Sequence, residues 1–256
     1  MENAAGSQRS TGLVRWTAIF AFAAYAACSL GYAADSWWAM PLGAQTLIYL
    51  AVAIALWRQR AWAAWFAIGI ALSGLTIDLF FVGAYFVGPD FLLDTAAQGV
   101  LLWLALRTRN PAVPAAAHAL TSGSPTRIGW TFALTAGVLP PLAMAALAPI
   151  PHGCFEVAPA GTFGDKVWLT LIPLAAVASL QLIARLRAAG VFLMLLTAAA
   201  GAVMLGESVA TSWQPLSVWE LRPEHLLVFI GQGFLIAALV PLGPTLARVL
   251  FARRER

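Results

Sequence analysis

The stretch PDFLLDTAAQGVLLWLAL (residues 89–106) has a counterpart in PEHLLVFIGQGFLIAALV (residues 223–240). The two align without a gap, with Pro on Pro, acid on acid, Leu-Leu on Leu-Leu and Gln-Gly on Gln-Gly. Leucine matches are expected by chance in a chain this apolar, whereas matches of Pro and Gln-Gly in register are not. The pair of segments therefore indicates a repeated unit.

The composition is that of a chain embedded in a membrane. Of the 256 residues, 61% are hydrophobic and 10% are charged, whereas a soluble domain carries about 25% charged residues. The formal net charge is +4, but most Arg residues stand at the ends of apolar runs, where they act as topology signals. The two cysteines and three histidines have no metal-ligating or redox spacing. We therefore expect no nucleic acid, no metal and no cofactor.

Apolar runs predict an all-α integral membrane protein with eight transmembrane helices. A span needs about 20 predominantly apolar residues. Within the fifth predicted span, Pro140-Pro141 is expected to kink or open the helix. The predicted spans are residues 13–33, 38–57, 62–87, 90–106, 128–149, 166–184, 190–212 and 224–249.

Further matches support a division into two units. Trp16-Thr17 matches Trp130-Thr131, RQRA (58–61) matches RLRA (185–188), and Gly74 matches Gly201 at the same offset as the latter pair. Four spans is an even number, so the units insert in the same direction. Parallel repeats are related by a pseudo-two-fold axis along the membrane normal, and sites tend to lie at the interface between them. The predicted organisation is a tail (1–12), a first four-helix repeat (13–108), a linker (109–127), a second four-helix repeat (128–250) and a basic tail (251–256).

Arginine positions predict the orientation. Every cluster of two or more Arg falls on one side of the eight-span arrangement, and most acids outside the spans fall on the other. Positive charge accumulates on the cytoplasmic side. We expect a multi-pass protein of the inner (plasma) membrane with both termini in the cytoplasm.

Gln98 and Gln232 lie near the middle of the fourth and eighth predicted spans. An amide in hydrocarbon must form hydrogen bonds, and between helices these contribute about 1–2 kcal/mol in model peptides. The Gly after each Gln is expected to permit close backbone approach. The two amides either hold helices together or face a central cavity or ligand.

Asp78 lies well inside the third predicted span, where a charged carboxylate costs roughly 2.5–3.5 kcal/mol and suggests a function. No Lys or Arg lies at that depth, so we expect hydrogen bonds to Gln98, Thr76 or Tyr25. Glu207 is its counterpart in the second half, although the strict register places Leu205 on Asp78. Glu207 is either a second acid of a site or an acid that reaches the outer surface.

Asp94 lies one helical turn from both Asp90 and Gln98, so the three share one stripe of the fourth span. In the eighth span Glu224 and Gln232 repeat the ends of this stripe. The stripe leads from the outer surface towards the middle of the membrane. Its acids are alternatively ordinary first-turn residues, favoured there by the helix dipole.

Three functions remain open on the sequence. The first is a small carrier or binding protein for a hydrophobic or amphipathic molecule, with intramembrane acids that exchange a proton. The second is a membrane enzyme acting on a lipid or isoprenoid by acid/base chemistry, and the third is a non-catalytic assembly subunit with a membrane-protein partner or a second copy. The candidate residues are Asp78 and Glu207 for proton transfer, and Gln98, Gln232, Asp94 and Tyr25 for binding.

Overall fold

The computed structural model describes residues 2–34, 39–60, 62–85, 88–108, 125–147, 171–172, 174–179, 181–182, 188–212 and 223–242. Its helices are α1 (Glu2–Ala34), α2 (Ala39–Trp57), α3 (Ala63–Tyr85), α4 (Pro89–Thr108), α5 (Pro125–Ala136), α6 (Leu139–Leu147), α8 (Ala188–Ser212), α9 (Pro223–Leu239) and the 3-10 turn η3 (Val240–Leu242). Residues 171–172, 174–179 and 181–182 are helical too. The described residues contain no β-strand, which confirms the all-α prediction.

Several helices have the length and apolar composition of membrane spans. Four described segments are long and apolar enough to cross a membrane: Gly12–Ala34, Ala39–Trp57, Ala63–Phe81 and Gly129–Leu147. Shorter apolar helices lie at Phe192–Val203 and Leu226–Leu239. These helices identify a membrane protein, whereas the full set of eight spans and the 4+4 division remain predictions.

Prolines mark helix boundaries as expected. Helices α4 and α9 begin at Pro89 and Pro223, because a proline at the first helical position loses no hydrogen bond and has a suitable φ. The fifth predicted span is broken at Gly137–Val138, immediately before Pro140-Pro141, and so consists of α5 and α6. The prediction of a broken or kinked helix there is confirmed.

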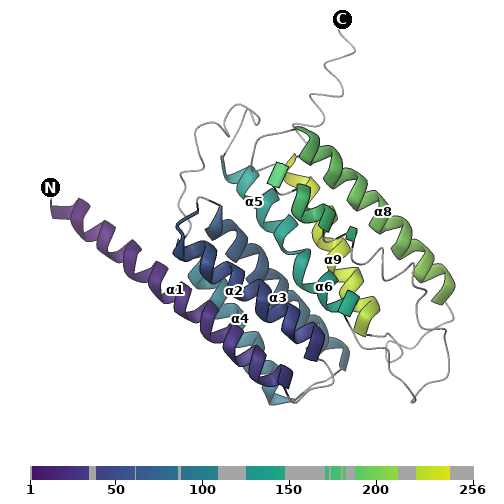
Figure 1. The fold of residues 1–256 in the computed structure, drawn as a ribbon, viewed down its shortest axis with the longest axis horizontal. Helices are drawn as coiled ribbons and strands as arrows, with labels where there is room; N and C mark the ends of the chain where they lie inside the picture. Colours follow the sequence, from purple (N-terminus) through teal and green to yellow (C-terminus); the bar gives the residue numbers. More distant parts are fainter. Residues whose placement is uncertain are drawn as a thin grey trace, which may run out of the picture.

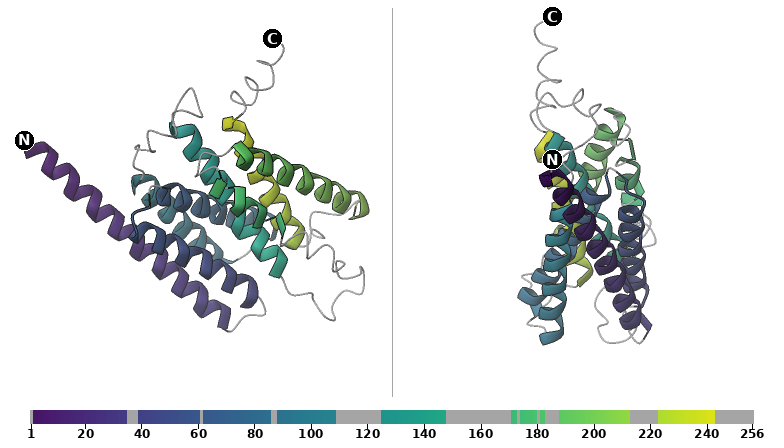
Figure 2. Two further views of the ribbon diagram at one scale, coloured as in Figure 1. Left: turned by 45° about the horizontal axis from the view of Figure 1, so that its top comes forward. Right: turned by 90° about the vertical axis from the view of Figure 1, so that its left-hand side faces the viewer.

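Helix α1 is longer than the predicted first span. It begins at Glu2, inside the segment 1–12 that was expected to be a tail. This segment contains Ala, Glu, Gln and Arg and lacks proline, so nothing in it stops a helix from continuing. Figure 2 shows the N-terminal part of α1 extending past the neighbouring helices.

The first four helices form a bundle (Figure 1). Helix α1 packs along α2 and α4, and α3 packs along α4 and α2. In the second half, α9 packs against the α5–α6 pair and against α8. Since α4 and α9 have the same neighbours within their halves, the packing is consistent with the predicted repeat.

The halves meet through one face of each. Helices α2 and α3 contact α5, α6 and α9. A two-fold axis would also require α8 to pack against α1 and α4, and in the described part of the chain α8 makes no extended contact with either. The described contacts between the halves therefore do not follow the predicted pseudo-two-fold symmetry. Figure 1 shows the two halves side by side.

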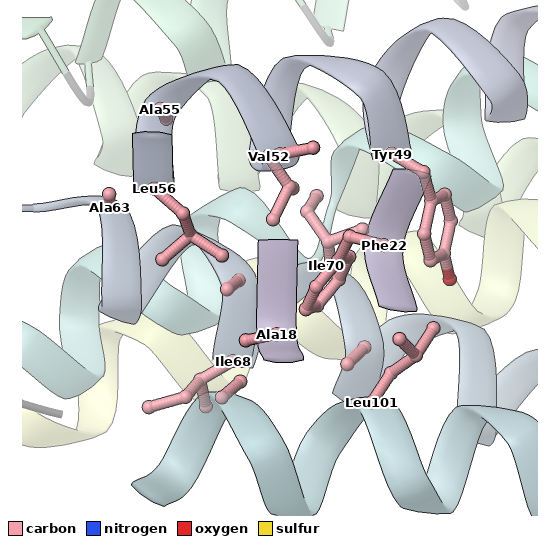
Figure 3. Packing of buried hydrophobic residues seen from close by; sticks show 14 of the residues in the cluster. Ala18, Phe22, Tyr49, Val52, Ala55, Leu56, Ala63, Ile68, Ile70 and Leu101 are labelled. Carbon is pink, nitrogen blue, oxygen red and sulfur yellow. The ribbon is translucent and has the colours of Figure 1, made fainter. Parts of the chain in front are cut away.

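Two apolar cores stabilise the molecule. Figure 3 shows the first, where Phe22 of α1, Val52 of α2, Ile70 of α3 and Leu101 of α4 pack together. Residues of α5 complete this first core, whereas α6 contributes to a second core with α9. Large apolar side chains such as Leu93, which is 70% exposed, also point outward. An outward apolar surface is what helices in contact with lipid present.

Candidate functional site

A connected group of polar side chains lies inside the first four-helix bundle, within an otherwise apolar core. All four helices α1 to α4 contribute to it, and we call it the polar network. Its members are Tyr25 of α1, Gln45 and Tyr49 of α2, Asp78 of α3, and Asp94 and Gln98 of α4.

Tyr25 is the centre of the polar network. Its hydroxyl donates a hydrogen bond to Asp94 Oδ1 at 2.8 Å. The same oxygen accepts from Gln98 Nε2 at 2.7 Å and from Gln45 Nε2 at 3.4 Å. One phenol therefore ties α1 to both α2 and α4. Tyr25 therefore belongs to the polar network, and its role in binding stays a prediction.

Gln98 is completely buried, and both ends of its amide are bonded. The Tyr49 hydroxyl, also completely buried, donates to Gln98 Oε1 at 2.8 Å. The ring of Tyr49 packs against that of Tyr25, with 4.6 Å between the ring centroids. Each hydrogen bond between membrane helices contributes about 0.6–2 kcal/mol, so Gln98 contributes to stability as well as to the arrangement of the site.

Asp78 and Asp94 form a carboxyl pair. Asp78 is only 4% exposed, and its carboxyl group interacts with that of Asp94. The Oδ2 atom of Asp78 is buried and has no hydrogen-bond partner among the described residues. Two carboxyl groups can hydrogen-bond to each other only when a proton lies between them, because an ionised carboxylate is an acceptor only. The pair is therefore a place where one proton can be held.

The expected partners of Asp78 are corrected by this arrangement. Thr76 is not one of them, because its hydroxyl donates to the backbone carbonyl of Leu72 at 2.7 Å. Its carboxyl group interacts with Asp94, so Asp94 and Gln98 of the stripe on α4 belong to the polar network. Tyr25 and Gln98 follow Asp94 in the same hydrogen-bonded group.

A glycine makes room for the network, but on a different helix from the one predicted. A Cβ atom at Gly74 of α3 would collide with the Tyr49 hydroxyl oxygen and lie 2.5 Å from Gln98 Cδ. A Cβ atom at Gly99 or Gly233, the residue after each Gln, would meet nothing within 4 Å. The expectation that these two glycines permit close approach is wrong, since each lies about 100° around the helix from the buried amide and faces open space.

The second half retains one element of the site. Gln232 is 3% exposed and donates from Nε2 to the backbone carbonyl of Ala198 at 2.8 Å. A Cβ atom at Gly201 would approach Gln232 Oε1, just as one at Gly74 would approach Gln98. The Gly-Gln contact thus occurs once in each half, on the residues that the sequence alignment pairs.

The rest of the polar network has apolar counterparts in the second half. In the alignment Leu205 stands for Asp78 and Val228 for Asp94, and Val228 packs against the second core. The polar network lies inside the first half, in contrast to the expected position between the halves. The side chain of Glu207, the predicted second acid, lies outside the described residues, as do those of Asp90 and Glu224.

Gln45 and Tyr49 were not predicted. They lie four residues apart on α2, so they share one face of that helix. Two polar groups at this spacing inside an apolar span were the available signal, although nothing in the sequence showed that this face turns towards α4. In the part of the chain that the structure describes, no three His, Cys, Asp or Glu side chains gather as metal ligands would.

Comparisons with protein-family models, with curated proteins and with solved structures return no match to this chain.

Proposed function

We propose that the protein is a membrane carrier or binding protein for a hydrophobic or amphipathic molecule, and that the Asp78–Asp94 pair exchanges a proton with binding. The observation that carries this proposal is the buried Asp78 carboxyl group, which has an unpartnered Oδ2 and interacts with Asp94 inside the first four-helix bundle. A carboxyl pair can change its charge by one unit without moving a helix. Such a change is costly in a membrane, so it is readily coupled to a ligand that compensates it.

The surroundings of the pair suggest the class of ligand. Besides the six members of the polar network, the described buried polar residues of the first half are Ser29, Thr46 and Ser73, and its core is otherwise formed mainly by Ala, Ile, Leu, Val, Phe and Trp side chains. A strongly polar solute would lack hydrogen-bond partners there. A molecule with a long apolar part and one polar group fits better, with its polar group near the unpaired Asp78 Oδ2.

The test begins with the ligand. The protein is purified in mild detergent, and mass spectrometry identifies the small molecules and lipids that co-purify. A labelled form of the co-purifying molecule is then followed across proteoliposomes with an imposed pH gradient. We expect flux that depends on the gradient in the wild type and at least a tenfold loss in Asp78→Asn. Equal, gradient-independent flux in both would remove the proposed mechanism.

A matched control separates the pair from general damage to the bundle. Thr17 of α1 is exposed, and its hydroxyl donates only to the backbone carbonyl of Leu13 at 3.0 Å. Thr17→Val should therefore retain wild-type flux. If it loses as much flux as Asp78→Asn, the loss cannot be assigned to the carboxyl pair.

The alternative of a membrane enzyme rests on one observation. Asp94 accepts a hydrogen bond from Tyr25, whereas Asp78 Oδ2 has no partner. Two acids in unlike surroundings suit proton transfer as acid and base. Chemical conversion of the co-purified lipid by the wild type, absent in Asp78→Asn, would favour this alternative over transport.

A further inference from the structure

The hydrogen bonds of the polar network run in a single direction. Tyr49 donates to Gln98 Oε1 at 2.8 Å. Gln98 Nε2 donates to the Tyr25 oxygen at 2.7 Å, and Tyr25 donates to Asp94 Oδ1 at 2.8 Å. Every donor along this path points towards Asp94, and we call the path the donor chain.

The direction of the donor chain follows from how many protons each group has. A phenol has one hydrogen and two lone pairs. The Tyr25 oxygen accepts from the amide nitrogens of Gln98 and Gln45, so its single hydrogen is left for Asp94. In the structure Tyr49 donates to Gln98 Oε1, which leaves Gln98 Nε2 to donate to Tyr25. Tyr49 therefore fixes Gln98, and Gln98 fixes Tyr25.

Asp94 and Asp78 consequently differ in the hydrogen bonds that they accept. Asp94 accepts a hydrogen bond at the end of a chain in which each bond polarises the next. Asp78 receives no donor at Oδ2. A carboxylate needs donors on its oxygens when it is buried, whereas the carbonyl oxygen of a neutral acid tolerates their absence better.

We infer that Asp78 holds the shared proton and donates it to the Asp94 carboxylate, and that Tyr49, Gln98 and Tyr25 are positioning residues which set this direction. The inference deepens the proposed function, because the role of the proton in binding rests on that proposal. The position of the proton can nevertheless be measured without any ligand or flux. The measured position of the proton can therefore contradict this inference independently of whether the transport experiment fails.

The test is infrared spectroscopy of the full chain in liposomes at neutral pH. Labelling of the Asp carboxyl groups with ¹³C separates their bands from those of Glu207 and the other Glu residues. We expect the carbonyl band of a protonated Asp in the wild type. Asp78→Asn should lose this band, and Asp94→Asn should retain it at a shifted frequency. A band that survives Asp78→Asn and disappears in Asp94→Asn would place the proton on Asp94 and overturn the inference.

Two tyrosine variants test the positioning role. Tyr25→Phe removes the donor to Asp94 and should shift the protonated-acid band. Tyr32 lies on the same helix but is 69% exposed, so Tyr32→Phe should leave the band unchanged. A purely structural role for Tyr25 would lower stability without moving the band, and an unshifted band in folded Tyr25→Phe contradicts the donor chain.

A second measurement needs no variant and keeps the inference testable if Asp78→Asn does not fold. Hydrophobic carbodiimides react with protonated carboxyl groups in membranes. Peptide mass spectrometry of the labelled wild type should find the adduct on Asp78 in preference to Asp94. Preferential labelling of Asp94 contradicts the inference.

Discussion

Gly74 and Gly99 lie on the neighbouring helices α3 and α4. Other side chains occupy the space beside Gly74, whereas the space beside Gly99 is open. A Cβ atom at Gly74 would collide with the Tyr49 hydroxyl oxygen, and one at Gly99 would meet nothing within 4 Å. Gly74→Ala should therefore push Tyr49 and Gln98 apart and cost about 1–3 kcal/mol of stability, as overpacking usually does. Thermal unfolding in one detergent measures the change.

Gly99→Ala is the control for that substitution. Alanine is about 0.5–1 kcal/mol more favourable than glycine inside a helix, so Gly99→Ala should leave stability unchanged or raise it slightly. If both alanine variants unfold at the same temperature, Gly74 does not make room for the network.

The two buried glutamines provide a second comparison. Gln98 joins two tyrosines, whereas Gln232 bonds only a backbone carbonyl. Both Gln98→Leu and Gln232→Leu should lower stability by about 1 kcal/mol or more, because each removes a buried hydrogen bond. Only Gln98→Leu should also impair binding of the co-purifying molecule. Equal binding loss in the two variants, measured at matched protein stability, would contradict a site confined to the first half.

The sequence predicted those single residues whose burial in an apolar segment costs free energy. An acid or amide within an apolar run must find partners, and this identified Asp78, Asp94 and Gln98. Tyr49 was missed because a tyrosine is common in membrane helices and carries no charge. Which groups pair depends on how the helices are rotated against one another, and an apolar sequence with few polar landmarks leaves that rotation open.

At the scale of the elements, α3 links the two halves by close backbone contact with α5. A Cβ atom at Gly69 of α3 would collide with the backbone carbonyl of Ala133 in α5. Gly129 and Gly137 stand four residues before and after Ala133, and a Cβ atom at each would contact Trp65 and Phe234, respectively. Small residues at four-residue spacing let membrane helices approach closely. This seam is tightly packed, which agrees with a polar site inside the first half.

Gly69→Ala tests the seam. The added methyl group would meet backbone and not a flexible side chain, so we expect a loss of about 1–3 kcal/mol or more. Gly43→Ala on α2 is the matched control, because a Cβ atom there meets nothing within 4 Å. Unfolding temperatures of the two variants in the same detergent decide the matter, and indistinguishable values would contradict close packing between α3 and α5.

Helix boundaries were more predictable than helix packing. Prolines at positions 89 and 223 start α4 and α9, and Pro140-Pro141 follows the break between α5 and α6. Each of these depends on the missing N–H of proline, which the sequence shows directly. The extension of α1 to Glu2 was missed because charged residues were taken to mark a tail, although they do not stop a helix.

At the scale of the whole molecule, the repeat and the orientation are separate predictions. The Gly-Gln contact lies on aligned residues in each half, and the described contacts between the halves are one-sided, so the repeat stays a prediction. Sequence similarity between two units predicts that they have the same internal packing. It carries no information about which outer faces they use against each other.

The orientation can be tested with reporter fusions. The distribution of Arg predicts both termini in the cytoplasm of an eight-span chain. A fluorescent protein fused after Arg256 should therefore fluoresce, and alkaline phosphatase at that position should be inactive. Alkaline phosphatase inserted in the predicted outer loop at residues 149–165 should be active. An active phosphatase at the C-terminus would contradict the eight-span arrangement.

The account depends most on a proton that the Asp78–Asp94 pair exchanges when a molecule binds. Proton release or uptake on binding can be counted directly by titrating the co-purifying molecule into weakly buffered protein with a pH-sensitive dye. We predict a change in bound protons for the wild type and for Thr17→Val, and none for Asp78→Asn. The same number of protons exchanged by the wild type and by Asp78→Asn, or no exchange by the wild type despite binding, would contradict the account.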